Sequence, residues 1–445
     1  MNNRRNRHSL TITSVGMAMI VLAAACRQHK PSSLQFEPTP RPVIAQAGFF
    51  PSHNGRVGVD LVSSPDVHLL AVVGDGDQAR LALFNSENGG DSFNPPVWVS
   101  EPGKKVTSRG EDSPALFVTQ DEMFAAWNEG RDLRFARSLS WGSSFEKPIN
   151  ITDKTGDSFS GYPSIGVAPN RDAYVVWIDT RDNVGESDDN YAVYLARSTD
   201  HGASFGRNVR IATKICPCCR PTVSFGPNGE VLVFWRHIYP GPIHDMTVAI
   251  STDNGATFSQ PQRIAEDNWK IDGCPDSGPA VARAGKRVYV AWLTEANPRI
   301  SGVRLSWSDD GGRTWSPAIM GSQSTIDANY PAFCVADDGS PVLVFQARDP
   351  HERAGWNPFG IYTVKIGPDG TLSPPVNGAW AHFIGHASGR CGGHRWPSLR
   401  GVDYGLQRKR DSLYVAWALD EARSVNEESE DAGCGAANSP VPCRV

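Results

Sequence analysis

The sequence predicts an all-β fold, a β-propeller built from six or seven four-stranded blades. A short motif, Ser-x-Asp-x-Gly-x-Ser/Thr-aromatic, recurs five times, at residues 86–93, 138–145, 198–205, 251–258 and 308–315. Its starts are 52, 60, 53 and 57 residues apart, a period that is too long for one helix pair and suits one propeller blade. Between the copies, apolar runs open after a proline and end near a tryptophan, as expected for short strands.

Each copy of the motif is interpreted as a structural turn. An aspartate such as Asp200 can accept backbone N–H groups two residues further on, and a glycine such as Gly202 can adopt positive φ at little cost. The closing aromatic residue supplies a large apolar side chain for packing between sheets. The first two copies replace the aspartate by Asn88 and Ser140 and are therefore weaker. We assign no chemistry to these turns.

Two apolar runs per repeat are interpreted as the first and second strands of a blade, separated by turn signals such as residues 227–229. Seven such pairs fit between residues 51 and 420, the predicted propeller domain. The pair at 397–420 either joins an N-terminal strand near 42–48 to form a seventh blade, or one hairpin is misassigned and the blades number six. Tryptophans recur at one strand position, which predicts core packing rather than sugar stacking; they are Trp127, Trp177, Trp235, Trp292 and Trp417.

The five motifs resemble the Asp boxes, or BNR repeats, of the sialidase superfamily. The resemblance covers residues 86–315, and the strand rhythm extends it to about residues 51–420. It implies a six-bladed propeller and an exo-α-sialidase-like glycosidase that acts on an extracellular glycan. Asp boxes also occur in other glycosidases and in non-enzymes, so the motif indicates the fold more strongly than the activity.

The composition of the 445-residue chain is unremarkable for one large β domain. Charged residues make up 20% and the net charge is −5. No basic stripe is present to favour a nucleic-acid partner. We expect a monomer that needs no cofactor and has a glycan or glycoconjugate as its partner.

The N-terminus has the pattern of an export signal. Three arginines within residues 4–7 precede an apolar stretch, residues 10–25, that is short for a membrane span. The stretch ends in Leu-Ala-Ala-Ala-Cys, which resembles a bacterial lipobox with its leucine one place early. We therefore expect a signal peptide at 1–25, a lipidated Cys26, a tether at 26–50 and a flexible tail at 421–445. This arrangement predicts an exported protein on the cell envelope, in the outer membrane if the cell has one; an uncleaved anchor or an ordinary signal peptide is the alternative.

Propeller topology places two sets of loops on one face: those that enter the first strand of each blade, and those that join the second strand to the third. These loops are rich in Arg, Asp, Glu, His and Tyr, whereas the opposite loops are mainly small turns. The resemblance implies that an arginine cluster binds the carboxylate of a sialic acid, that a tyrosine is the nucleophile, and that a separate carboxyl is the acid. The candidate acids are Asp112, Asp179 and Asp276 with Glu111; the candidate nucleophiles are Tyr162 and Tyr330; the candidate arginines are Arg131, Arg181, Arg220, Arg236, Arg348 and Arg395.

Two alternatives to catalysis remain open at this point. The Phe/Tyr-Arg-Ile-Pro motif of authentic sialidases is missing, which favours a non-catalytic surface lipoprotein that binds a glycan or another partner. A metal-binding propeller is the second alternative, with Cys216, Cys218, Cys219 and His237 as weak candidate ligands. Disulfides are the expected state of the cysteines in an exported protein, and one cysteine of 216–219 can pair with Cys274 on the next blade.

Overall fold

The computed structural model describes residues 67–391 apart from gaps at 75, 88–92, 109–110, 120, 155, 184–189, 337–338, 352–358 and 378–387. The chain divides into two compact units, Met1–Arg41 and Pro42–Val445, and every described residue belongs to the second. The predicted signal peptide, Cys26, the tether, the 397–420 hairpin, Arg395 and the tail lie outside the described residues. Within the described part, no helix is long and apolar enough to cross a membrane.

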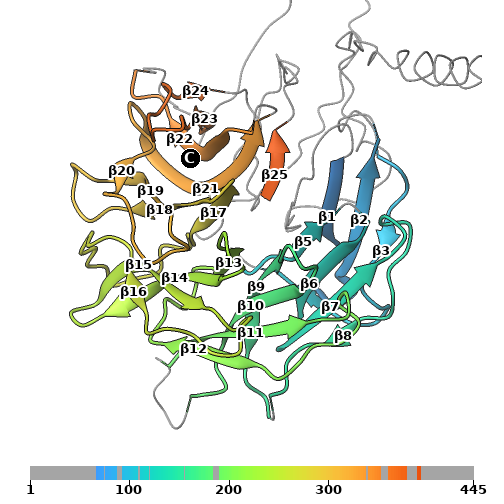
Figure 1. Ribbon diagram of the computed structural model, residues 1–445. Helices are drawn as coiled ribbons and strands as arrows, with labels where there is room; N and C mark the ends of the chain where they lie inside the picture. Colours follow the sequence, from blue (N-terminus) through green and yellow to red (C-terminus); the bar gives the residue numbers. More distant parts are fainter. Residues whose placement is uncertain are drawn as a thin grey trace, which may run out of the picture. The chain divides into compact units, whose positions relative to one another are not determined.

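The described chain is all-β apart from one short 3-10 turn, η2 (Gly76–Gln78). Its strands form six sheets that follow one another in chain order (Figure 1). The first sheet contains β1 (Val67–Val73), β2 (Arg80–Ser86) and β3 (Val97–Trp98). The second contains β4 (Val106–Thr107), β5 (Ala115–Val118), β6 (Met123–Glu129), β7 (Asp132–Ser138) and β8 (Ile149–Asn150).

The third, fourth and fifth sheets are complete four-stranded blades in strict sequence order. The third contains β9 (Ser160–Val167), β10 (Ala173–Asp179), β11 (Ala192–Ser198) and β12 (Val209–Thr213). The fourth contains β13 (Thr222–Phe225), β14 (Val231–Tyr239), β15 (Ile243–Ser251) and β16 (Gln262–Arg263). The fifth contains β17 (Ala280–Ala284), β18 (Arg287–Thr294), β19 (Gly302–Ser308) and β20 (Ile319–Met320).

The sixth sheet adds one parallel strand to the blade pattern. It contains β21 (Ile326–Ala336), β22 (Pro341–Arg348), β23 (Gly360–Lys365), β24 (Val376–Asn377) and β25 (Ser388–Cys391). The strand β25 pairs in parallel with β21, whereas all other pairings are antiparallel. The prediction of an all-β, propeller-like fold of four-stranded blades is confirmed.

The repeated motifs form the predicted turns at the end of the third strand of a blade. In the third sheet, Asp200 Oδ1 accepts the backbone N–H of Ser204 at 2.9 Å and the Ser198 hydroxyl at 2.7 Å. Ser198 Oγ in turn accepts the Gly202 N–H at 2.8 Å. The Ser204 hydroxyl donates to Asp200 Oδ2 at 2.5 Å, and this bond, together with those from the Ser204 N–H and the Ser198 hydroxyl, lowers the pKa of Asp200 to about 2. The expected bond two residues further on is corrected: the aspartate spans four residues and closes the whole turn.

The weaker copy at 138–145 keeps the same turn with a serine in place of the aspartate. Ser140 Oγ accepts the Ser144 N–H at 3.1 Å, and Ser138 Oγ accepts the Gly142 N–H at 2.9 Å. Ser140 Oγ also lies 3.0 Å from Ser144 Oγ, so one hydroxyl oxygen makes both contacts that the two carboxylate oxygens of Asp200 make with Ser204. The substitution preserves the turn geometry without a carboxylate.

The turns also connect neighbouring sheets. Phe205, which closes the motif of the third sheet, packs edge-on against Phe135 of the second sheet at a ring distance of 4.8 Å. Gly202 has a φ of 78°, and a Cβ there would lie 2.8 Å from the Phe135 ring. Glycine is thus required both by the backbone conformation and by the close approach of the next sheet. The predicted role of the aromatic residue as an inter-sheet plug is confirmed.

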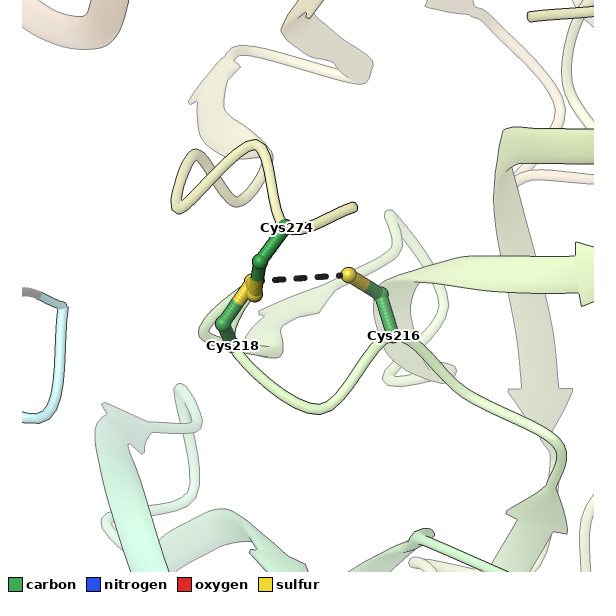
Figure 2. Close-up of side chains that lie close together, drawn as sticks. All are labelled: Cys216, Cys218 and Cys274. Carbon is green, nitrogen blue, oxygen red and sulfur yellow. Dashed lines mark hydrogen bonds between the residues drawn. A yellow bond between two sulfur atoms is a disulfide. The ribbon is translucent and has the colours of Figure 1, made fainter. Parts of the chain in front are cut away.

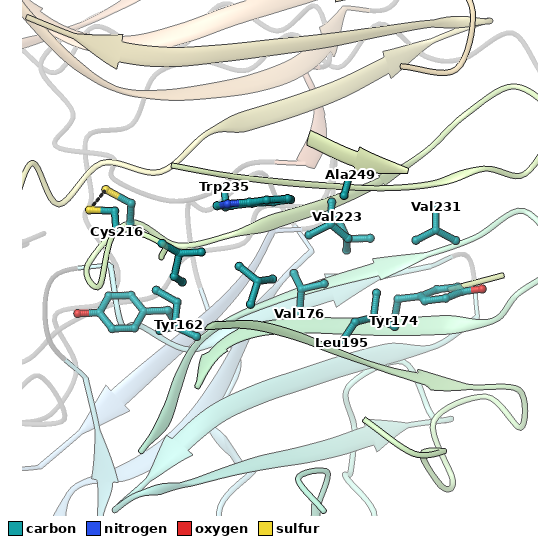
Figure 3. Packing of buried hydrophobic residues seen from close by; sticks show 14 of the residues in the cluster. Tyr162, Tyr174, Val176, Leu195, Cys216, Val223, Val231, Trp235 and Ala249 are labelled. Carbon is teal, nitrogen blue, oxygen red and sulfur yellow. Dashed lines mark hydrogen bonds between the residues drawn. The ribbon is translucent and has the colours of Figure 1, made fainter. Parts of the chain in front are cut away.

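Buried tryptophans occupy the same place in successive sheets. Trp127, Trp177, Trp235 and Trp292 are all 0% exposed. Trp235 belongs to a cluster shared by the third and fourth sheets, in which Tyr162 and Cys216 lie at one end and Tyr174 at the other (Figure 3). The prediction of core packing is confirmed for these four residues. The apolar cores between sheets hold the loops of each blade in fixed register with those of the next.

We expect Trp177→Ala to lower the free energy of unfolding by about 3–5 kcal/mol, because it removes a large buried side chain and leaves a cavity. It also removes the 2.8 Å hydrogen bond from Trp177 Nε1 to Asp179. Urea unfolding followed by fluorescence measures the change. Leu139→Ala is the control, since Leu139 is 53% exposed and its loss should change stability by less than about 0.5 kcal/mol. A similar midpoint for the two variants would contradict the packing role of Trp177.

Candidate functional site

The loops that enter the first strands of three blades meet at the carboxyl group of Glu111. Glu111 precedes β5, Arg220 precedes β13 and Gly278 precedes β17. The Glu111 carboxyl accepts the backbone N–H of Arg220 at 2.8 Å and that of Gly278 at 2.7 and 2.8 Å. The N–H of Glu111 donates to Asp276 Oδ1 at 3.3 Å. Segments more than a hundred residues apart in the chain are thus joined at one side chain.

The side chain of Arg220 adds further hydrogen bonds to this junction. Arg220 is 2% exposed, and its Nε donates to the backbone oxygen of Glu111 at 2.8 Å. Its Nη2 donates to the backbone oxygen and the hydroxyl of Ser113 at 2.5 and 2.6 Å. The guanidinium group therefore holds the 111–113 loop in place.

The environment keeps Glu111 protonated at neutral pH. Burial of its carboxyl raises the pKa of Glu111 to about 8, and the charges of Cys219 and Asp276 act in the same direction. The N–H groups of Gly278 and Arg220 oppose this shift but do not cancel it. A neutral carboxyl group can donate a proton, which is the property required of a general acid.

Tyr330 belongs to the same electrostatic environment. Burial raises the pKa of Tyr330, and the negative charges of Asp276, Glu111 and Cys219 add to the increase. The site therefore contains a neutral phenol beside acidic groups. Tyr330, Asp276 and Glu111 were all predicted from the sequence; Asp276 accepts the Glu111 N–H, and Tyr330 lies close enough for the charges of both groups to raise its pKa.

Three candidate residues adopt the left-handed backbone conformation that is uncommon for residues other than glycine. Their φ values are 58° for Tyr162, 48° for Asp276 and 51° for Tyr330. Tyr162 and Tyr330 each precede a proline, at a register shift between the first and second strands of their blades. Such conformations cost about 1–3 kcal/mol each and persist where the surroundings hold them. The shifts turn both residues out of the regular strand pattern.

Asp112 and Tyr162 form a separate contact between the second and third sheets. Asp112, which is buried, accepts the Tyr162 N–H at 2.6 Å and the side-chain amide of Asn128 at 3.3 Å. Asn128 also donates to the backbone oxygen of Ser160 at 3.2 Å. These bonds hold the bulge at Tyr162 against the preceding blade.

Asp179 and Arg181 anchor their own loop. Asp179 is 0% exposed, and its two oxygens accept bonds from Ser160, Trp177 and Arg181 at 2.8–3.0 Å. Arg181 also reaches Asp153 Oδ1 at 2.6 Å and lies over the Tyr194 ring at 4.2 Å. The hydrogen bonds with Arg181 and Trp177 keep the pKa of Asp179 below its usual value despite burial. Asp179 is therefore held as an ionised acceptor.

The remaining predicted arginines also contact protein groups. Arg131 pairs with Asp157 at 3.5 Å, and Arg348 pairs with Asp327 at 3.0 Å. Arg236 is 1% exposed and donates to the backbone oxygens of His244, Ser277 and Leu293 at 2.9–3.2 Å. Of this set, Arg220 and Arg236 adjoin the Glu111 centre, through Ser113 and Ser277. Arg131, Arg181 and Arg348 each pair with a carboxylate of their own.

A group of sulfur atoms lies next to the Glu111 centre. Cys218 and Cys274 form a disulfide that joins the loop before β13 to the loop before β17, so one cysteine of 216–219 pairs with Cys274 as expected. The expectation of disulfides is wrong for Cys216 and Cys219, which are buried free thiols. Cys216 Sγ faces the disulfide (Figure 2). Cys334 is also disulfide-bonded.

The candidate metal ligands are only partly brought together. The sulfur atoms of Cys216, Cys218 and Cys274 lie within 4.8 Å of one another, but two of the three are joined in the disulfide. His237 Nδ1 lies 3.3 Å from Trp235 Nε1. Burial lowers the pKa of His237 to about 4, with a contribution from Lys214, so its imidazole is neutral at physiological pH.

Sequence reasoning did not identify the backbone groups of Gly278 and Ser277 or the side chain of Ser113 as parts of the centre. Their common signal is position: each lies one or two residues before the proline that opens a first strand. The same positions include Arg220 and Tyr330, which precede Pro221 and Pro331, but not Asp276, which lies three residues before Pro279.

Residues 183–344 match the BNR repeat-like domain. The match covers the part of the chain from β11 to β22 and agrees with the turn motifs at 198–205, 251–258 and 308–315. No protein of curated function matches the chain.

Several solved structures are similar at low identity. A protein of unknown function from Dyadobacter fermentans is 14% identical, with a TM-score of 0.46, over 71% of this chain and 95% of that one. The Hadza microbial sialidase Hz136 is 15% identical, with a TM-score of 0.42, over 71% and 67%. A leech intramolecular trans-sialidase is 10% identical, with a TM-score of 0.42, over 69% and 75%. Similarity at this level transfers no activity to the present chain.

We expect Glu111→Gln to flatten the pH dependence of stability. The pKa of Glu111 is about 8 in the folded protein and 4.5 ordinarily. The stabilisation that the protonated Glu111 carboxyl contributes to folding is therefore fully present below about pH 4.5 and is lost as the pH rises through about 8. Urea midpoints measured across this range should decline in the parent and change less in Glu111→Gln. Exposed Glu87→Gln is the matched control for removal of one carboxyl. Parallel declines in the parent and Glu111→Gln would contradict the raised pKa.

Proposed function

We propose that this chain is an exported, sialidase-like glycoside hydrolase whose reactive centre consists of Glu111, Asp276 and Tyr330. The observation that supports it is the junction of three blade-entry loops at a protonated carboxyl, with a tyrosine in the same electrostatic environment. These loops lie on the face that propeller topology makes available to a ligand.

Glu111 is the proposed general acid. Because its pKa is raised to about 8, it holds a proton at neutral pH and can transfer it to the oxygen of a departing sugar. Departure of an aglycone as an alkoxide without such protonation is slow. The hydrogen bonds from Arg220 and Gly278 then stabilise the carboxylate that remains.

Tyr330 is the proposed nucleophile, with Asp276 as the group that accepts its proton. A tyrosine suits a substrate whose anomeric carbon bears a carboxylate, because an anionic nucleophile would be repelled by that group. The raised pKa of Tyr330 means that the phenol must lose its proton during attack, and the neighbouring carboxylate of Asp276 can receive it. Terminal sialic acid is therefore the substrate that we propose.

Non-catalytic glycan binding is the second candidate function, and the arginines favour it. Arg131, Arg181 and Arg348 pair with Asp157, Asp153 and Asp327. An arginine already neutralised by a protein carboxylate binds a substrate carboxylate less strongly. A site of this kind would hold a polar sugar without strong recognition of one acidic group.

We expect Tyr330→Phe to lower the release of a fluorogenic aglycone from a sialoside by at least about a hundredfold, since the covalent route is lost. Tyr289→Phe is the matched control, because Tyr289 lies beside Trp307 near the turn of the fifth sheet. Its turnover should equal that of the parent. Parent turnover that Tyr330→Phe leaves intact would contradict the role of Tyr330. Glycan binding by a folded parent with no turnover would instead establish the binding function.

We also propose that the protein is anchored to the cell envelope through a lipid on Cys26. The supporting observation is the apolar stretch that ends in Leu-Ala-Ala-Ala-Cys. Cys26→Ser should move the protein from the detergent phase to the aqueous phase of a Triton X-114 extraction, because acyl chains supply the membrane affinity. Retention of Cys26→Ser in the detergent phase would show that an uncleaved apolar segment is the anchor.

A further inference from the structure

The four sulfur atoms beside the Glu111 centre form a chain that leads from the surface into the core. Cys274 is exposed, Cys218 is 6% exposed, and Cys216 and Cys219 are each 1% exposed. Cys216 Sγ lies 3.7 Å from Cys218 Sγ and 3.4 Å from Cys219 Sγ. The Cys216 sulfur is therefore the central one of the four. It contacts the disulfide on one side (Figure 2) and the Cys219 thiol on the other.

We propose that Cys216 and Cys219 are a buried dithiol that exchanges with the Cys218–Cys274 disulfide. In the first step, the Cys216 thiolate attacks Cys218 Sγ, the Cys216–Cys218 bond forms, and Cys274 leaves as a thiolate. In the second step, the Cys219 thiolate attacks Cys216 Sγ, the Cys216–Cys219 bond forms, and Cys218 leaves as a thiolate. One disulfide and two thiols are present before and after, so no external oxidant or reductant is consumed.

The burial of the sulfur atoms sets the direction of the first step. Attack on Cys218 expels Cys274, whose residue is exposed, so the leaving thiolate enters water rather than the core. The hydrogen bond with Cys219 and the charge of Arg236 lower the pKa of Cys216, which raises the fraction of this thiol that is ionised at a given pH. A thiolate is the attacking species in such exchange.

The order of the two steps follows from the position of the second thiol. Cys219 Sγ lies 3.4 Å from Cys216 Sγ, so the sulfur that it contacts is a free thiol before the first step. Cys216 becomes part of a disulfide only in the first step, and Cys219 can then attack it.

The buried guanidinium of Arg236 favours exchange over metal binding. Its charge lowers the pKa of both Cys216 and Cys219, as a cation close to the thiols should. The same positive charge repels a metal cation that the thiolates of Cys216 and Cys219 could otherwise bind. The exchange frees the loop before β17, which carries Asp276 and Gly278, from its covalent link to the loop before β13.

The test is alkylation of Cys274 in the folded, full-length protein by N-ethylmaleimide, without added oxidant or reductant. Cys274 lies in a different tryptic peptide from the other three cysteines, so mass spectrometry of that peptide reads out its release. We expect labelling of Cys274 to be at least about tenfold faster in the parent than in Cys216→Ser. Cys219→Ser should accumulate the Cys216–Cys218 disulfide, because the second step is blocked.

Cys216→Ala provides a second variant without the attacking sulfur, and near-ultraviolet circular dichroism verifies that each variant is folded. Equal rates of Cys274 labelling in the parent and in both folded Cys216 variants would overturn the proposal. So would a stoichiometric metal ion in the isolated protein with all four cysteines reduced. The readout does not involve a glycan, so its failure and that of the proposed hydrolase are distinguishable.

Discussion

The loop face of this protein depends on one carboxyl group that accepts backbone hydrogen bonds from two other blades. The N–H groups of Arg220 and Gly278 lie just before first strands, where no strand partner satisfies them, and a buried N–H without a partner is costly. Glu111 supplies the acceptor at 2.7–2.8 Å. Because the carboxyl is held neutral, its burial avoids the large penalty of an isolated buried charge. The burial of the Glu111 carboxyl among these loops therefore both joins the loops and keeps the carboxyl protonated.

The fold could be predicted from the sequence because its signals are local. The hydrogen bonds from Gly202 to Ser198 and from Ser204 to Asp200 lie within one turn, as does the positive φ of Gly202, and the motif recurs in each repeat. The tryptophans were also predictable, since one apolar residue at a constant strand position must face a neighbouring sheet. The prediction that the aspartate accepts an N–H two residues further on was wrong. Asp200 accepts the N–H of Ser204, four residues on, because the turn places that group next to its carboxylate.

The candidate centre was predictable only in part. Asp179 and Asp276 were equal candidates in the sequence, yet Asp179 is neutralised by Arg181 two residues away, whereas Asp276 accepts the Glu111 N–H and raises the pKa of Tyr330. The pairing of Asp179 with Arg181 was visible in the sequence as an acid and a base in one short loop. The position of Asp276 beside Glu111 depends on how the blades stack, which residue spacing does not determine. The same holds for Arg131 and Arg348, whose carboxylate partners lie 26 and 21 residues away.

The disulfide and the Glu111 junction hold the same loop, which raises the question of how one acts on the other. An electrostatic route is the weaker one, because burial is the largest cause of the raised pKa of Glu111 and the charge of Cys219 is a smaller one. A change at the sulfur atoms therefore leaves the largest cause in place. The remaining route is mechanical: Cys274 lies two residues before Asp276 and four before Gly278, so release of Cys274 leaves that loop attached by its hydrogen bonds alone. A sulfur exchange would thus change the position of the loop before it changed the strength of the acid.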